Sequence, residues 1–282
     1  MATIGVQLMM VRDKIAAEGL APVLERLAAL GYEAVEVSQV PTDAASIDAL
    51  DAARRQLGLQ VAALSVGLKK GPFTTGDALD TDLGKIVADC RRLDCRYVRI
   101  GMMPFEAMVS TEALTAFALD AEAAAQTLAA SGITLAYHTH HVEFARYDGE
   151  TAFQILGRLA PTLRFEIDVH WVQRAGCDPL AVLRDLTGRV PLVHLKDYRV
   201  TTLDASALDL LTRGDVGGFM TAFTGLAQFA ELGAGNLDIG AIAAQALDSG
   251  AEFLIVEQDE LYGRDAYDCL ADSIAHLRAL GY

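Results

Sequence analysis

Short apolar runs alternate with longer amphipathic stretches along almost the whole chain. The runs have the composition of buried strands, and the stretches between them repeat apolar residues at the three-to-four-residue spacing of helices. We expect strands at residues 3–11, 34–37, 60–66, 97–100, 133–137, 163–168, 191–196 and 253–257. We expect helices at residues 21–30, 46–57, 78–93, 111–130, 151–159, 179–188, 239–248 and 265–280.

Eight strand–helix units in this order predict a (β/α)8 TIM barrel. The strands are short and continuously apolar, as parallel strands are when helices cover the outer face of the sheet. The first expected strand is not followed by the glycine-rich fingerprint of dinucleotide-binding folds, which disfavours an open doubly wound sheet. We therefore expect one barrel domain over residues 1–282.

One segment, residues 199–238, interrupts the alternation of strands and helices. It contains helix-like pieces near residues 208–211 and 219–226, with Gly217-Gly218 between them. A connection of this length within a compact domain is usually functional. Because it follows the seventh strand, a barrel would place it on the C-terminal face. We expect a lid or a homo-oligomer contact there, and the alternative is a neutral surface insertion.

Composition and charge limit the possible partners and the compartment. The 282 residues are 52% hydrophobic and carry a formal net charge of −15, which argues against binding the phosphates of a nucleic acid. The four cysteines form no C-x-x-C pair, so a reduced compartment fits best. We see neither a signal-peptide pattern nor an apolar run long enough to span a bilayer. We therefore expect a cytoplasmic protein without a membrane or nucleic-acid partner.

Histidines gather at the end of the fifth expected strand. Residues 138–143 contain three of the six histidines in the chain and Glu143. Active sites of TIM barrels lie at the C-terminal ends of the strands. Strand alternation places His138 and His140 on one face, so we expect both side chains to point toward the barrel mouth.

Other expected strands end in polar residues as well. Alternation places Glu166, Asp168 and His170 on one face of the sixth strand, and His194 and Lys196 on one face of the seventh. Glu257 ends the eighth strand, Glu36 lies on the second and Gln7 on the first.

Carboxylates and imidazoles that point into an apolar barrel are costly unless they are paired or bind a metal ion. The mixed set Glu143, Asp168, His194 and Glu257 suits a catalytic Mn²⁺, Mg²⁺, Co²⁺ or Zn²⁺ with an open position. His138 is the alternative to Glu143 as the first ligand, because it lies on the strand itself.

Four segments resemble motifs of the xylose-isomerase-like TIM-barrel superfamily of sugar phosphate isomerases and epimerases. Residues 137–144 resemble its Y-H-N-H-x-x-E-F motif, with Thr139 in place of the usual asparagine. Residues 165–171, 192–197 and 255–259 resemble its strand-six motif and its V-H-L-K-D and V-E-Q-D motifs. The resemblance covers nearly the whole chain, with all four motifs in the right order.

The resemblance implies that Asp168, His194 and Glu257 are metal ligands and that Glu257 is also an acid–base group. Many members of the superfamily carry the first ligand as a glutamate on strand five, six residues after the preceding glycine. Counting from Gly132, that position is His138. The choice between His138 and Glu143 therefore stays open at the level of the sequence.

The resemblance implies a metal-dependent isomerase or epimerase of a small sugar or keto-sugar, phosphorylated or not. Such an enzyme moves a proton through a metal-stabilised enediolate. Glu257 is the candidate base, and His138, His140 or Lys196 is the candidate proton donor on the other side. Candidate substrate contacts are Gln7, Glu36, His170, Trp171 and Arg264. Arg99, on the fourth strand, is expected to form an ion pair with Glu36 or Glu166.

Three other functions occur with the same kind of site or fold. The same residues suit a lyase or dehydratase of a keto-inositol or keto-sugar derivative, because dehydration passes through the same enolate. A non-catalytic sugar-binding protein on this fold is the alternative outside enzymes. A base-excision endonuclease shares the superfamily, but the strong acidity and the lack of a basic, aromatic surface argue against DNA binding.

Overall fold

Eight parallel strands close into a barrel in the computed structural model, which describes residues 2–71, 74 and 76–282. Around the barrel the order is β1-β2-β3-β4-β5-β8-β9-β12, and β12 pairs with β1. The bounds are β1 Thr3–Gln7, β2 Ala34–Val37, β3 Gln60–Val66, β4 Tyr97–Ile100, β5 Thr134–His138, β8 Arg164–Asp168, β9 Leu192–Leu195 and β12 Phe253–Val256. This confirms the expected (β/α)8 TIM barrel.

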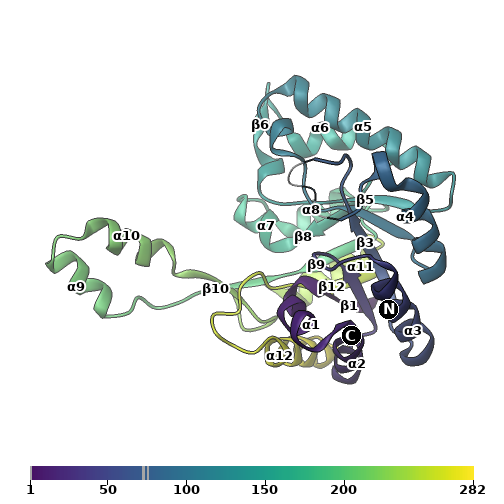
Figure 1. Cartoon of the computed structure of the whole chain (residues 1–282). Helices are drawn as coiled ribbons and strands as arrows, with labels where there is room; N and C mark the ends of the chain where they lie inside the picture. Colours follow the sequence, from purple (N-terminus) through teal and green to yellow (C-terminus); the bar gives the residue numbers. More distant parts are fainter. Residues whose placement is uncertain (1, 72–73, 75) are drawn as a thin grey trace.

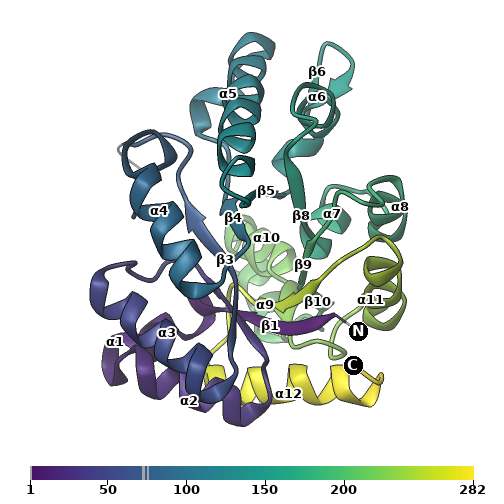
Figure 2. The same cartoon turned by 90° about the vertical axis from the view of Figure 1, so that its right-hand side faces the viewer.

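Helices pack around the outside of the barrel, as the end-on view in Figure 2 shows. Their bounds are α1 Arg12–Glu18, α2 Leu20–Leu30, α3 Ala44–Leu57, α4 Leu79–Leu93, α5 Thr111–Ala129, α6 Ala152–Leu159, α7 Val169–Arg174, α8 Pro179–Asp185, α11 Ile239–Asp248 and α12 Ala266–Ala279. A short hairpin, β6 Arg146–Tyr147 and β7 Glu150–Thr151, precedes α6. No helix in the described part of the chain is long and apolar enough to cross a membrane.

Side-chain caps mark the ends of two strands, and β1 ends earlier than the apolar pattern predicts. The Gln7 side chain accepts a hydrogen bond from the Met9 backbone N–H at 2.6 Å, so the chain leaves β1 for a 3-10 helix, Leu8–Val11. Asp168 likewise accepts from the Trp171 N–H at 3.0 Å and caps α7. The expectation that His170 shares a strand face with Asp168 is therefore wrong, because His170 lies on α7.

The register of the parallel strands brings the polar residues of neighbouring strands together. Asp168 of β8 lies beside His194 of β9, and His194 lies beside Ile255 of β12, two residues before Glu257. His138 of β5 lies beside Glu166 of β8. These residues therefore gather at and just below the carboxyl end of the barrel.

An arm leaves the barrel after β9. It comprises β10 Asp197–Val200, α9 Ser206–Thr212, α10 Val216–Thr224 and β11 Ala227–Ala230. The strands β10 and β11 pair antiparallel and form a stalk, and the two helices lie at its far end, well away from the barrel (Figure 1). In the end-on view of Figure 2 the helices lie in line with the barrel opening.

Candidate active site

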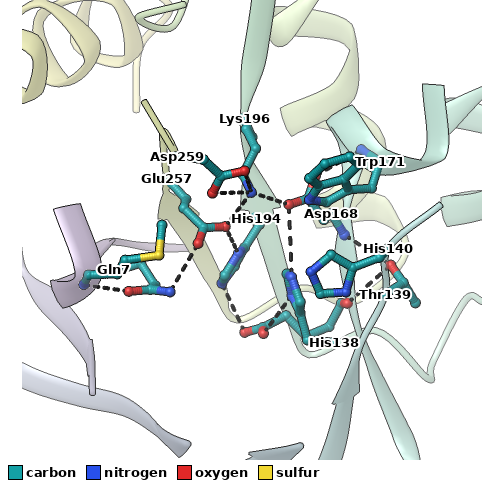
Figure 3. Close-up of polar contacts among 12 residues, drawn as sticks. Gln7, His138, Thr139, His140, Asp168, Trp171, His194, Lys196, Glu257 and Asp259 are labelled. Carbon is teal, nitrogen blue, oxygen red and sulfur yellow. Dashed lines mark hydrogen bonds and ion pairs between the residues drawn. The ribbon is translucent and has the colours of Figure 1, made fainter. Parts of the chain in front are cut away.

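Four buried side chains converge at the carboxyl end of four neighbouring strands. His138, Asp168, His194 and Glu257 each offer one nitrogen or oxygen atom, and these atoms all lie within 4.8 Å of one another. The residues come from β5, β8, β9 and the end of β12 (Figure 3). We call them the four-residue group.

His194 lies at the centre of this arrangement. Its Nδ1 is 2.7 Å from Glu257 Oε2, and its Nε2 is 3.1 Å from Glu36 Oε2 and 3.3 Å from Glu166 Oε1. Burial alone would lower the pKa of His194, but the three surrounding carboxylates raise this pKa well above its usual value. The imidazole is thus held between the carboxylate of Glu257 on one side and those of Glu36 and Glu166 on the other.

A layer of charged side chains supports the group from inside the barrel. Arg99 Nε lies 2.7 Å from Glu36 Oε1 and 3.3 Å from Glu166 Oε2, which confirms the expected ion pair. Glu166 Oε2 also lies 3.0 Å from His138 Nδ1, so Glu166 contacts two histidines of the four-residue group. Burial raises the pKa of Glu36 to about 7. Glu36, a candidate substrate contact, is completely buried beneath the group with its carboxylate engaged.

Lys196 places its ammonium among three carboxylates. Its Nζ is 3.0 Å from Asp168 Oδ2, 2.8 Å from Glu257 Oε2 and 3.0 Å from Asp259 Oδ1, and the side chain is 1% exposed. Burial raises the pKa of Asp168 to about 6, against the opposing charge of Lys196. Burial would lower the pKa of Lys196, but the carboxylates raise it, so the ammonium stays protonated. Asp259 lies within the V-E-Q-D-like motif, yet its contact with Lys196 was not foreseen.

The two histidines at the end of β5 stay neutral. Burial lowers the pKa of His140 to about 2, and it lowers the pKa of His138 well below the usual value. The two rings lie edge to face with centroids 4.6 Å apart. Within the described part of the chain, His140 Nδ1 is buried and has no hydrogen-bond partner. His140 lies just beyond β5, next to the group rather than in it.

Aromatic rings form one wall beside the group. His170 stacks on Phe229 of the arm with centroids 4.7 Å apart, and Lys196 Nζ lies 5.4 Å from the centre of the Trp171 ring. Among the described residues, both ring nitrogens of His170 and Nε1 of Trp171 are buried without a hydrogen-bond partner. Phe229 was missed because no motif surrounds it and it reaches the wall only through the pairing of β11 with β10.

Glu143 lies outside the four-residue group. Its Oε1 accepts a hydrogen bond from the Tyr137 hydroxyl at 2.5 Å, and its Oε2 accepts one from the His140 backbone N–H at 2.7 Å. After β5 the chain turns into a 3-10 helix, Val142–Phe144, which directs Glu143 back toward Tyr137. The geometry therefore differs from the expected ligand set, because His138 stands where Glu143 was expected.

Two further candidate substrate contacts have different surroundings. Gln7 Nε2 donates to Glu257 Oε1 at 3.0 Å, so Gln7 borders the group and orients one of its carboxylates. Arg264 pairs with Glu231 Oε1 at 2.8 Å and with Asp272 Oδ2 at 2.7 Å, and its side chain is 40% exposed. Arg264 thus lies in an ion-pair network at the surface rather than beside the four-residue group.

A cavity of about 1320 Å³ opens between the loops that follow β2, β3 and β4. Ser38, Ser65, Gly101 and Met102 contribute to its lining. These loops lie across the barrel mouth from β9, because β3 is diametrically opposite β9 in the strand order. The mouth therefore has a charged side with the four-residue group and a more apolar side with the cavity.

Comparison with known proteins identifies the family. The model of the xylose isomerase-like TIM barrel family matches residues 24–280. No curated protein matches the sequence significantly. A sugar phosphate isomerase/epimerase from Parabacteroides distasonis superposes with a TM-score of 0.72 at 18% identity, over 99% of this chain and 98% of its own.

Two other solved structures have the same fold. The probable 3-DHS dehydratase AsbF from Bacillus anthracis superposes with a TM-score of 0.68 at 12% identity, over 98% of each chain. The IOLI protein, solved with a bound zinc atom, gives a TM-score of 0.68 at 14% identity, over 99% of this chain and 97% of its own. At these identities the structures establish the fold alone.

Proposed function

Because the chain belongs to the xylose isomerase-like TIM barrel family, we propose that it is a divalent-metal-dependent isomerase or epimerase of a small sugar or keto-sugar. One observation carries the proposal: His138, Asp168, His194 and Glu257 bring four ligand atoms within 4.8 Å of one another in a buried site. The reaction moves a proton on a carbon next to a carbonyl group.

The residues present fit a divalent ion. Two imidazoles and two carboxylates are ligands that Mn²⁺, Co²⁺ and Zn²⁺ accept, and Mg²⁺ is the least suited to the imidazoles. The zinc atom of the IOLI protein supports the same chemistry on this fold. When bound, the ion supplies positive charge that stabilises an enediolate form of the substrate.

The protein's own groups carry the proton. Glu257 is held anionic by Lys196 and His194, although burial opposes it, and these charges keep the pKa of Glu257 well below its usual value. An anionic carboxylate of this kind suits a metal ligand well, and its low pKa makes Glu257 a weaker base. His140 is neutral and its Nδ1 has no hydrogen-bond partner in the described structure, so its ring can hydrogen-bond the substrate on the other side, where the proton is delivered. Lys196, fixed as an ammonium, stabilises negative charge on the substrate between them.

The aromatic wall and Gln7 orient the substrate. The ring nitrogens of His170 and Nε1 of Trp171, which have no partner among the described residues, can bind sugar hydroxyls, since buried polar groups of this kind need partners. The rings themselves offer an apolar surface to the C–H face of a sugar. Gln7 donates to Glu257 and so fixes the carboxylate that faces the substrate.

The four free cysteines support the expectation of a reducing compartment.

Dehydration is the competing reaction. The AsbF structure is that of a probable 3-DHS dehydratase, and expulsion of a β-hydroxyl from a keto-polyol passes through the same enolate. A keto-inositol or keto-sugar lyase therefore uses the same residues, and a non-catalytic sugar-binding protein would use only the aromatic wall. Product analysis separates these three functions.

The test incubates metal-loaded protein with a panel of ketoses, ketose phosphates and keto-inositols in D₂O and follows the products by NMR. We expect deuterium on the carbon next to the carbonyl, together with a rearranged or epimerised sugar. Removal of metal by a chelator and the variant Asp168→Asn should each abolish the exchange. The variant Asp185→Asn, at an exposed position of α8, is the matched control and should exchange normally.

The other outcomes decide against the proposal. An enone or dione product that forms only with metal would establish the dehydratase instead. Saturable binding of a sugar without any exchange would establish the non-catalytic protein. Exchange that survives both the chelator and Asp168→Asn would refute the metal-dependent mechanism.

A further inference from the structure

The helices of the arm expose more apolar surface than a free surface normally carries. Every residue of α10 is at least partly exposed, and so is every residue of α9 except Ala207. Exposed large apolar side chains of the arm are Val200, Leu208, Leu211, Val216, Met220 and Phe223. At 43% to 62% exposure each, they present roughly 500 Å² of apolar area, and patches of this size mark interaction sites.

Helix α10 is poorly suited to stand alone. Its sequence, VGGFMTAFT, contains no charged residue and two adjacent glycines, Gly217 and Gly218. Glycine disfavours a helix interior by about 1 kcal/mol relative to alanine, and isolated helices of this length are marginal in water. Such a helix depends on packing of its apolar side chains, and α9 covers only part of them.

The arm is held in a fixed direction at its base. The stalk pairs Asp197 with Ala230 and Val200 with Ala227, with two further pairs between them. The buried Asp197 carboxylate accepts backbone N–H groups of Gly233 and Gly235 at 3.1 Å each. A side chain at Gly235 would collide with Asp197, since a Cβ there would lie 2.3 Å from its Cγ. These contacts tie the base of the stalk to the loop that follows β11.

The opposite side of the barrel mouth carries a complementary apolar surface. Met102 is 40% exposed and Val109 is 77% exposed in the connection between β4 and α5. Met102 also lines the 1320 Å³ cavity between the loops that follow β2, β3 and β4. We call this region the apolar rim.

We propose that α9 and α10 dock on the apolar rim of a second copy of this chain, and that the two copies exchange arms in this way. The base of the arm follows β9 and its helices stand in front of the mouth, and the rim follows β4, on the other side of the mouth (Figures 1 and 2). A two-fold axis perpendicular to the barrel axis turns the two mouths toward each other. Where this axis is also perpendicular to the line from the arm to the rim, it brings the arm of each copy above the rim of the other in a closed isologous dimer.

The apolar area of the arms approaches that of a stable dimer interface. Burial of both arms would remove roughly 1000 Å² of apolar surface, and the parts of the rims that they cover would add to it, which brings the total toward the ~1,200–2,000 Å² of stable interfaces. The base of the arm already touches the site, because Phe229 stacks on His170. Each mouth would thus be closed by its own stalk and by the helices of the partner.

Sedimentation equilibrium and light scattering test the assembly directly. We expect the full chain to be a dimer, and the double variant Met220→Asp/Phe223→Asp to be a monomer with the far-ultraviolet circular dichroism of the parent. Leu57→Asp, an equally exposed apolar position at the end of α3, is the matched control and should stay dimeric. A wild-type chain that is monomeric across the micromolar range, or a double variant that stays dimeric, would overturn the proposal.

Cysteine cross-linking tests the docking surface and needs no unfolded variant. Phe223→Cys and Val109→Cys proteins are mixed under mild oxidation, with the wild-type chain as the background for its four native thiols. We expect a disulfide between Phe223→Cys and Val109→Cys, found by mass spectrometry. A disulfide only between two copies of Phe223→Cys would show arm-to-arm packing and would overturn docking on the apolar rim.

Discussion

Replacing Glu143 by glutamine separates a structural role of this carboxylate from a role in metal binding. Both oxygens accept hydrogen bonds in a completely buried position, from the Tyr137 hydroxyl and the His140 N–H. A glutamine keeps one acceptor and turns an NH₂ group toward the other donor, which leaves that donor unsatisfied at a cost of about 1–3 kcal/mol. Loss of a charge-assisted bond adds to this cost.

Burial offsets part of that loss. It raises the pKa of Glu143, so the charged carboxylate itself carries a desolvation cost that the neutral amide avoids. We therefore expect Glu143→Gln to lower the free energy of unfolding by about 2 kcal/mol, which corresponds to a fall in Tm of about 4–8 °C for a chain of this size. Thermal unfolding followed by circular dichroism measures this change.

Metal affinity should depend on His138 and hardly on Glu143. Because Glu143 lies outside the four-residue group, Glu143→Gln should bind Mn²⁺ within about threefold of the wild-type affinity. His138→Gln should weaken binding at least about 100-fold, because outer-layer contacts alone account for 10–100-fold. Calorimetric titration of chelator-treated proteins measures both. Loss of binding in Glu143→Gln with binding retained in His138→Gln would refute the reasoning.

Three further predictions address the surroundings of the group. Glu166→Gln should weaken Mn²⁺ binding about 10–100-fold, since Glu166 orients two histidines, while Glu122→Gln should leave it unchanged; equal affinities of the two variants would contradict this. Lys196→Met should destabilise the metal-free protein by about 3–5 kcal/mol, because it removes the ammonium that three neighbouring carboxylates share. Mn²⁺ should then raise its Tm more than that of the wild type, and an equal or smaller rise would count against the site. Burial lowers the pKa of His170 to about 3, so its contribution to stability is complete above the unfolded pKa of about 6.5 and is lost as the pH falls. Between pH 6.5 and 5 the free energy of unfolding of the metal-free wild type, measured in urea, should therefore fall by about 1.6 kcal/mol more than that of His170→Gln. Parallel pH profiles of the two proteins would refute the burial of His170 in its neutral form.

The barrel could be predicted from the sequence because its signals are local. Each strand is a short, mainly apolar run, and the helices have their own period and end signals, such as Asp178 before Pro179. The polar residues at strand ends were predictable for the same reason, because alternation fixes their faces. Asp168, His194 and Glu257 accordingly converge as their strand positions indicate.

Contacts made beyond the strand ends could not be predicted in this way. Whether His138 or Glu143 joins the group depends on how the chain turns after β5, which the Tyr137 hydroxyl and the His140 N–H decide. The helix α7 is only six residues long, and its cap, Asp168, also reads as the end of a strand. The place of Phe229 beside His170 depends on pairing between strands separated by two helices.

Crystals grown with Mn²⁺ and measured at an anomalous-scattering wavelength test the central claim most directly. The account predicts one strong anomalous peak per chain, with His138, Asp168, His194 and Glu257 as its protein ligands. The peak should disappear in Asp168→Asn crystals. A peak ligated by Glu143 in place of His138, or an Mn²⁺-soaked crystal with no peak among these four side chains, would contradict it.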